Sequence, residues 1–276
     1  MEGLKISHKK VQIEGLKNTY TFLHITDLHL VCISEDETMA RIEHAKARKE
    51  SFRVNGITSD MWLEKLMKYA NDRKVDAVLL TGDILDFPSP EAIMTLKQAL
   101  ETLEMPYVYI IGNHDWSYLD DYHTEASIKR DRPLLRTLSA GNEEFHTVKV
   151  GEVTFVAVDN STDAYSREMI SWLEETLARE ENVILLQHIP LYCDTLHEDS
   201  AAFWGEDLTL GKGAVAPDDS ADLVKDILLG EPAVKAVICG HLHFEHKDLV
   251  GGILPQYITA LSAHGNATLF EVGNVI

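Results

Sequence analysis

Acidic residues, histidines and one asparagine recur along the chain in five short motifs. They are Asp27-Leu28-His29, Gly82-Asp83-Ile84-Leu85-Asp86, Gly112-Asn113-His114-Asp115, the single His188, and Gly240-His241-Leu242-His243. Carboxylate oxygens and neutral imidazoles are suitable ligands for first-row metals such as Mn, Fe, Zn or Co. Side chains of this number can hold two ions, provided that one aspartate bridges them. The motifs therefore predict a metal centre that could clamp both the attacking and the leaving oxygen of a hydrolysis.

Each motif directly follows a short apolar run with the composition of a strand. The runs are residues 20–25, 75–80, 107–111, 183–187 and 234–239. Open α/β sheets collect ligands at the carboxyl ends of their strands, where residues far apart in sequence can meet. The residues predicted to converge there are Asp27, His29, Asp83, Asn113, His114, His188, His241 and His243.

Helical segments alternate with these strands, which is typical of an α/β fold. Helices are predicted over residues 60–74, 90–104 and 166–179. In the second half, residues 144–150 and 153–158 flank Gly151, which we interpret as the turn of a hairpin. Further strands are predicted over residues 254–258 and 268–272. Hairpins in one half and strand–helix units in the other predict mixed sheets.

The order of the five motifs resembles that of the calcineurin-like metallophosphoesterases. This resemblance implies an αββα sandwich, in which two mixed sheets are flanked by helices. It also implies that one metal is bound by Asp27, His29 and His243, and the other by Asn113, His188 and His241. Asp83 would bridge the two ions. His114 would protonate the leaving group as a general acid, and Asp115 would orient its imidazole.

The same resemblance implies hydrolysis of a phosphodiester by a metal-bridging hydroxide. Ile111 stands where the Ser/Thr protein phosphatase branch has an arginine, so the pattern is closer to the bacterial phosphodiesterase-like branch. A phosphomonoesterase or a nucleotide pyrophosphohydrolase on the same site is the alternative. A noncatalytic interaction scaffold would be expected to have lost ligands or His114, and all eight positions are intact.

Two long polar segments interrupt the pattern of strands and helices. Residues 31–59 follow the first motif, and residues 189–230 lie between His188 and the last motif. Long insertions in a compact domain are commonly lids or binding loops. No repeat or linker marks a boundary, so we predict one domain over residues 1–276 with a lid at 189–230. Within that segment, Phe203 and Trp204 either stack on a base or anchor the insertion.

Histidines outside the motifs are more simply interpreted as structural. His24 alternates with apolar side chains, which predicts a buried hydrogen bond, whereas His123 and His197 lie close enough to motifs to be candidate substrate contacts. Asp83 and Asn113 would each be read as turn residues if they stood alone.

The composition restricts the compartment and the partners. The formal net charge of -20 repels nucleic-acid backbones and anionic membranes, so no tight nonspecific nucleic-acid binding is expected. The three cysteines are widely spaced and form no disulfide framework, and no apolar run reaches membrane-spanning length. A cytoplasmic protein acting on a small phosphate ester is predicted. The charge permits a monomer without requiring one.

Overall fold

The apolar runs form two β-sheets in the computed structural model, which describes residues 3–139, 141–211 and 219–274. The first sheet has the strand order β1 (Lys5–Gln12), β11 (Asn266–Gly273), β2 (Tyr20–Ile25), β3 (Ala77–Thr81) and β4 (Tyr107–Ile110). The second has the order β5 (Phe145–Val150), β6 (Val153–Val158), β7 (Val183–Leu186), β8 (Val234–Cys239), β10 (Leu254–Ile258) and β9 (His246–Val250).

Both sheets are mixed, as the sequence predicts. In the first sheet β2, β3 and β4 are parallel, while β11 runs antiparallel to β2. In the second sheet β6, β7, β8 and β10 are parallel, and the edge strands β5 and β9 are antiparallel to their neighbours. The carboxyl ends of β2, β3 and β4 therefore point the same way, and so do those of β7 and β8 within their sheet.

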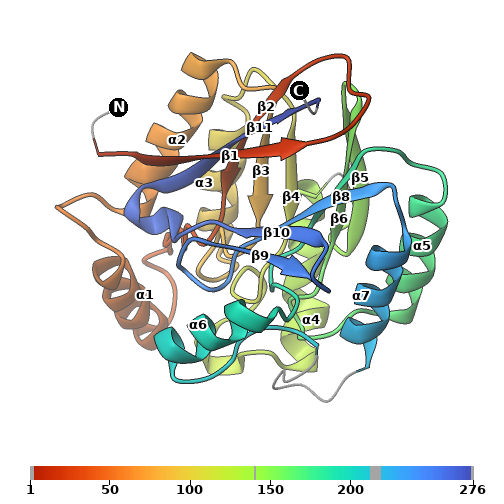
Figure 1. Cartoon of the computed structure of the whole chain (residues 1–276). Helices are drawn as coiled ribbons and strands as arrows, with labels where there is room; N and C mark the ends of the chain where they lie inside the picture. The colour runs from red at the N-terminus through yellow and green to blue at the C-terminus, as the bar shows by residue number, and fades with distance from the viewer. Residues whose placement is uncertain (1–2, 140, 212–218, 275–276) are drawn as a thin grey trace.

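Helices cover the outer faces of both sheets (Figure 1). Side chains of α2 (Ser59–Arg73) and α3 (Pro90–Leu100) pack on the first sheet. Side chains of α5 (Arg167–Leu177) and α7 (Ser220–Gly230) pack on the second. The inner faces form one apolar layer, in which Phe22 of β2 meets Phe155 of β6 edge to face at 4.8 Å. This is the expected αββα sandwich.

The remaining helices lie outside these layers. They are α1 (Met39–Ser51), α4 (Glu125–Asp131) and α6 (Asp194–Trp204), with short 3-10 turns at Leu119–Asp121, Arg132–Thr137 and Ser262–His264. The sequence did not predict α1, α4, α6 or α7, and three of these, α1, α6 and α7, lie in the long polar segments. In α1 only Ala45 is fully buried, so no apolar stripe reveals the helix. Among the described residues, no helix has the length and hydropathy needed to cross a membrane.

His24 fills the inter-sheet layer in the structural role expected of it. Its Nδ1 and Nε2 each lie 2.7 Å from a hydroxyl, those of Thr259 and Thr81 respectively. Burial lowers the pKa of His24 to about 3, so the folded protein holds this ring neutral. The unfolded chain protonates it below a pKa of about 6.5. Proton uptake by the unfolded state alone makes stability fall as the pH drops from about 6.5 toward 3.

We therefore expect the neutral substitution His24→Gln to make the free energy of unfolding less dependent on pH in this acidic range. Wild-type stability should lose up to about 1.4 kcal/mol per pH unit more than the variant does below pH 6. Urea unfolding of both metal-free proteins between pH 7 and pH 4 measures the difference. Other titrating groups are common to both proteins and cancel. If the difference in free energy of unfolding between the two proteins stayed constant from pH 7 to pH 4, the assignment of a neutral buried His24 would be contradicted.

Candidate metal centre

The predicted ligands leave their strands through strained backbone turns. Asp27, His29, Asp83, His241 and His243 have φ of 50°, 47°, 50°, 72° and 64°, in the left-handed region that residues with a Cβ rarely adopt. Such strain persists where the surrounding structure imposes it, and it clusters at functional sites. Each turn directs a side chain across the strand ends instead of along the sheet.

Glycines in the motifs allow these turns to approach one another. A Cβ on Gly240 would overlap Thr26 Oγ1 and lie 2.6 Å from Asp27 Oδ2. A Cβ on Gly112 would overlap Asp83. Both motif glycines are therefore required by close packing against ligands and not by turn geometry alone.

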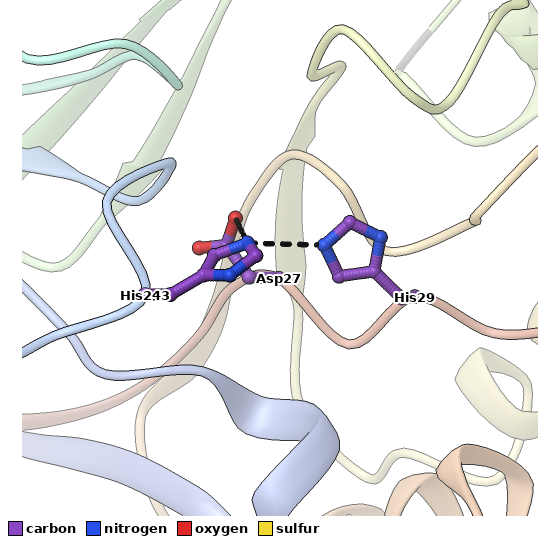
Figure 2. A group of neighbouring side chains, drawn as sticks. All are labelled: Asp27, His29 and His243. Carbon is purple, nitrogen blue, oxygen red and sulfur yellow. Dashed lines mark hydrogen bonds and ion pairs between the residues drawn. The ribbon is translucent and has the colours of Figure 1, made fainter. Parts of the chain in front are cut away.

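A first group of side chains comprises Asp27, His29 and His243 (Figure 2). His29 Nε2 and His243 Nε2 face each other at 3.2 Å, and His243 Nε2 lies 3.4 Å from Asp27 Oδ1. His29 Nδ1 is bonded to Asp86 at 2.9 Å, which leaves Nε2 free to face this group. Burial lowers the pKa of His29, which favours the neutral form that binds metals.

A second group comprises Asp83, His188 and His241. His188 Nδ1 donates to Thr81 O at 2.7 Å, so its Nε2 faces Asp83 Oδ2 at 3.2 Å. Burial alone would lower the pKa of His188, but the carboxylate of Asp83 raises it to about 10. Burial, with the neighbouring His188, lowers the pKa of His241 to about 3.

Asp83 lies between the two groups. Its Oδ2 is 3.2 Å from His188 Nε2 and 3.9 Å from His29 Nε2, while its Oδ1 accepts a hydrogen bond from His114 N at 2.8 Å. Burial would raise its pKa, but the surrounding histidines hold it well below the usual range. An ionised carboxylate in this position is suited to contact two cations at once.

Asn113, predicted as a further ligand, is held in one orientation by Tyr122. Asn113 Nδ2 donates to Tyr122 Oη at 2.9 Å, which fixes the orientation of the amide. Asn113 Oδ1 is buried and has no hydrogen-bond partner among the described residues. A buried acceptor left unsatisfied is unfavourable unless something binds it. Together with the two carboxylates and the imidazoles, this oxygen fits a site for two first-row metal ions.

The two sheets contribute to each group and are tied together at the site. Asp27 follows β2 of the first sheet, and its carboxylate accepts the backbone N–H of His241, which follows β8 of the second, at 3.0 Å. The bond from His188 to Thr81 O joins the ends of β7 and β3 in the same way. The side chains that converge thus also link the two halves of the fold.

The role expected of Asp115 is wrong. Its Oδ2 accepts the N–H groups of Asp83 and Gly112 at 2.8 and 2.6 Å, and its Oδ1 accepts that of Leu85 at 2.7 Å. Burial and the nearby Asp83 raise the pKa of Asp115 to about 7. The carboxylate thus ties its own turn to the loop after β3, and it faces these backbone groups instead of His114.

Asp86 is the carboxylate next to the imidazoles of His29 and His114. Its Oδ1 lies 2.9 Å from His29 Nδ1 and 3.7 Å from His114 Nδ1. Arg48 of α1 donates two hydrogen bonds to the Asp86 carboxylate, from Nε to Oδ2 at 2.7 Å and from Nη2 to Oδ1 at 2.5 Å. Phe52 stacks on the His29 ring at 4.5 Å. Residues 31–59 therefore contribute side chains that hold a predicted ligand, which no motif in that segment indicated.

A cavity of about 270 Å³ opens beside the second group. Its lining includes Asn113, His241, Tyr122, His123, Asp163, Glu206 and Asp207. The ring of His123 lies between Trp116, at 4.8 Å, and Tyr122, at 3.8 Å. His197 instead stacks on Tyr192 and does not line this cavity. Of the two candidate contacts, only His123 borders the site.

Removing the Tyr122 hydroxyl is expected to weaken the second group. In Tyr122→Phe the amide of Asn113 loses the acceptor that orients it, and Oδ1 is no longer held in one position. Groups that orient ligands in this way contribute about 10- to 100-fold to metal affinity or activity. Manganese titration of the metal-free variant measures the change. Tyr192→Phe is a matched control, and equal affinities in all three proteins would contradict this role for Tyr122.

Comparisons with known proteins agree with this geometry. The family model described as calcineurin-like phosphoesterase matches residues 20–245. A probable glycerophosphodiester phosphodiesterase of Arcobacter nitrofigilis is 25% identical over 62% of this chain and 57% of that protein, so the chain spans little more than half of that relative. A 3',5'-cyclic-nucleotide phosphodiesterase of Nostoc is 24% identical over 81% of this chain and 71% of that protein.

Two solved structures share the fold. A dimetal phosphatase from Danio rerio superimposes with a TM-score of 0.59 at 15% identity, covering 89% of this chain and 88% of that one. A purple acid phosphatase from yellow lupin gives a TM-score of 0.57 at 13% identity, covering 92% of this chain and 46% of that one. The family model spans most of the sequence, including all five motifs. The chain therefore belongs to the calcineurin-like phosphoesterase family.

Proposed function

We propose that the chain hydrolyses small phosphodiesters at a centre of two metal ions. Asp27, His29 and His243 would hold one ion, and Asn113, His188 and His241 the other, with Asp83 shared between them. The observation that carries the proposal is the position of Asp83 between two groups of inward-facing ring nitrogens. The ions, when bound, would supply an acidified water molecule as nucleophile and positive charge against the phosphate oxygens.

His114 is assigned to the leaving group. Its ring lies 4.8 Å from that of His29, and 28% of its side chain is exposed, whereas Asp27 and His188 are fully buried. Asp86, the nearest carboxylate, is already held by Arg48 and His29. The imidazole of His114 is thus accessible to an ester oxygen and is positioned to donate a proton to it.

The charge of the cavity favours a diester over a monoester. Asp163, Glu206 and Asp207 line it, and no lysine or arginine does among the described residues. A monoester dianion carries one more negative charge than a diester and would be repelled more strongly there. The relatives named as cyclic-nucleotide and glycerophosphodiester phosphodiesterases support the same choice.

The proposal also covers the identity of the metals, the domain organisation and the compartment. Oxygen and nitrogen ligands suit Mn, Fe, Zn or Co. Residues 1–276 would form one domain in which 189–230 borders the site, although residues 212–218 lie outside the described part. The free thiols Cys32, Cys193 and Cys239 suit a reducing compartment such as the cytoplasm.

The test uses metal-stripped protein with added manganese on bis-(p-nitrophenyl) phosphate and p-nitrophenyl phosphate. We expect metal-dependent cleavage with the higher kcat/KM on the diester. Preference for the monoester would replace the proposal by a phosphatase or nucleotidase function. Two bound ions without turnover of either compound would support the scaffold alternative.

A further inference from the structure

Three aromatic side chains, two of them exposed and the third partly buried, form a ledge beside the first group of ligands. Phe203 and Trp204 end α6, and Phe244 directly follows His243. Phe203 lies 5.2 Å from Trp204 and 5.3 Å from Phe244. Trp204 meets the ring of His243 edge to face at 5.1 Å. These three residues are called the aromatic ledge below.

Anchoring of the α6 segment explains only part of the ledge. Trp204 Nε1 donates to Leu242 O at 3.1 Å, which fixes the indole against the last motif. Phe203, by contrast, is 58% exposed, and 40% of Trp204 is still exposed. Large apolar rings exposed together next to a polar site commonly mark a binding surface. The fixed indole and the exposed phenyl ring thus form a preorganised face open to solvent.

The ledge lies at one end of a row of rings. His114 contacts His29 at 4.8 Å, His29 contacts His243 at 5.2 Å, and His243 contacts Trp204 at 5.1 Å. His114, the proposed proton donor to the leaving alcohol, is therefore at the opposite end of the row from the ledge. If a diester lies along this series of rings with its leaving alcohol at His114, its other alcohol is on the side of Trp204.

We propose that the aromatic ledge binds an aromatic ring, such as a nucleobase or a phenyl group, in the alcohol that stays on the phosphate after cleavage. This assignment rests on the proposed phosphodiesterase function. Stacking on aromatic side chains tolerates many rings because each has a π-face. A neutral ring also avoids repulsion by Glu206, which follows the ledge by two residues and lines the neighbouring cavity.

The experiment compares two diesters that share a leaving group. Bis-(p-nitrophenyl) phosphate keeps an aromatic alcohol on the phosphate, whereas methyl p-nitrophenyl phosphate keeps methanol. In Phe203→Ser we expect kcat/KM to fall about tenfold on the first diester and to stay within about twofold on the second. Phe203→Tyr retains a ring and should restore most of the loss.

A matched control is Met94→Ser, because Met94 is 57% exposed on α3, outside the site. It should leave both substrates unchanged. Equal losses on both diesters in Phe203→Ser, or no loss on either, would overturn the assignment while leaving the phosphodiesterase function intact. If the wild-type protein cleaved neither diester in the presence of manganese, the proposed function itself would fail and the ledge assignment with it.

Discussion

His114→Ala is expected to lower kcat by about 10²- to 10⁴-fold on a dialkyl phosphodiester such as glycerophosphoethanolamine. An alkoxide leaves from phosphorus with difficulty unless a proton reaches its oxygen, and in the proposed mechanism His114 supplies that proton. The p-nitrophenolate anion leaves without protonation. On bis-(p-nitrophenyl) phosphate the same variant should therefore lose far less, about tenfold or below. Single-turnover rates on both substrates at saturating manganese measure the two losses.

Comparing the losses on the two substrates distinguishes proton donation by His114 from a structural role of its side chain. His114 N also donates to Asp83 Oδ1, but through the backbone, so that bond survives truncation of the side chain. Metal content should thus remain at the wild-type level, as measured by elemental analysis. Equal losses on the two leaving groups would show that His114 acts by shaping the centre and not by proton donation.

Asp83→Asn is expected to prevent the proposed centre from holding two metal ions at once. The amide keeps the shape of the side chain but removes the negative charge that lies between His29 and His188. We expect the variant to hold one ion fewer per chain at equal manganese. Its kcat/KM should fall about a thousandfold, since charge stabilisation by an ion is worth several kcal/mol and each 1.36 kcal/mol is tenfold.

Asp76→Asn provides a matched control for this variant. Asp76 Oδ2 accepts the backbone N–H of Thr21 at 2.7 Å, so the substitution removes a structural carboxylate outside both ligand groups. It should lower the unfolding temperature without changing metal stoichiometry. If Asp83→Asn still bound the wild-type number of ions, a shared role for Asp83 would have to be given up.

The strands and the convergence of the motifs were predictable because their signals are local. The apolar runs before Asp27 and His241 became β2 and β8 with the predicted bounds, 20–25 and 234–239. Parallel strand ends then bring the motifs together whatever their separation in sequence. His29 and His243, 214 residues apart, follow strands of different sheets, and their pairing was expected only from the resemblance to the family.

The supporting contacts were not predictable, because they depend on tertiary packing. Arg48 and Phe52 lie in a polar segment whose helix has almost no buried face, so nothing local directs them toward His29. Tyr122 belongs to no motif, and its bond to Asn113 depends on how the loop between them folds. The role of Asp115 was wrong because adjacency in sequence to His114 does not determine which way a side chain in a tight turn points.

The hydrogen bonds that join Asp27 to His241 and His188 to Thr81 have a consequence for how the protein can diverge. Substitution of Asp27 or His188 removes a bond between the two sheets together with a proposed ligand, so we expect these two positions to tolerate little change. Phe203, exposed at the end of α6, carries no such double constraint. Libraries aimed at new substrates should therefore randomise the aromatic ledge and leave the strand-end turns unchanged, and natural lineages are expected to have drifted in the same pattern.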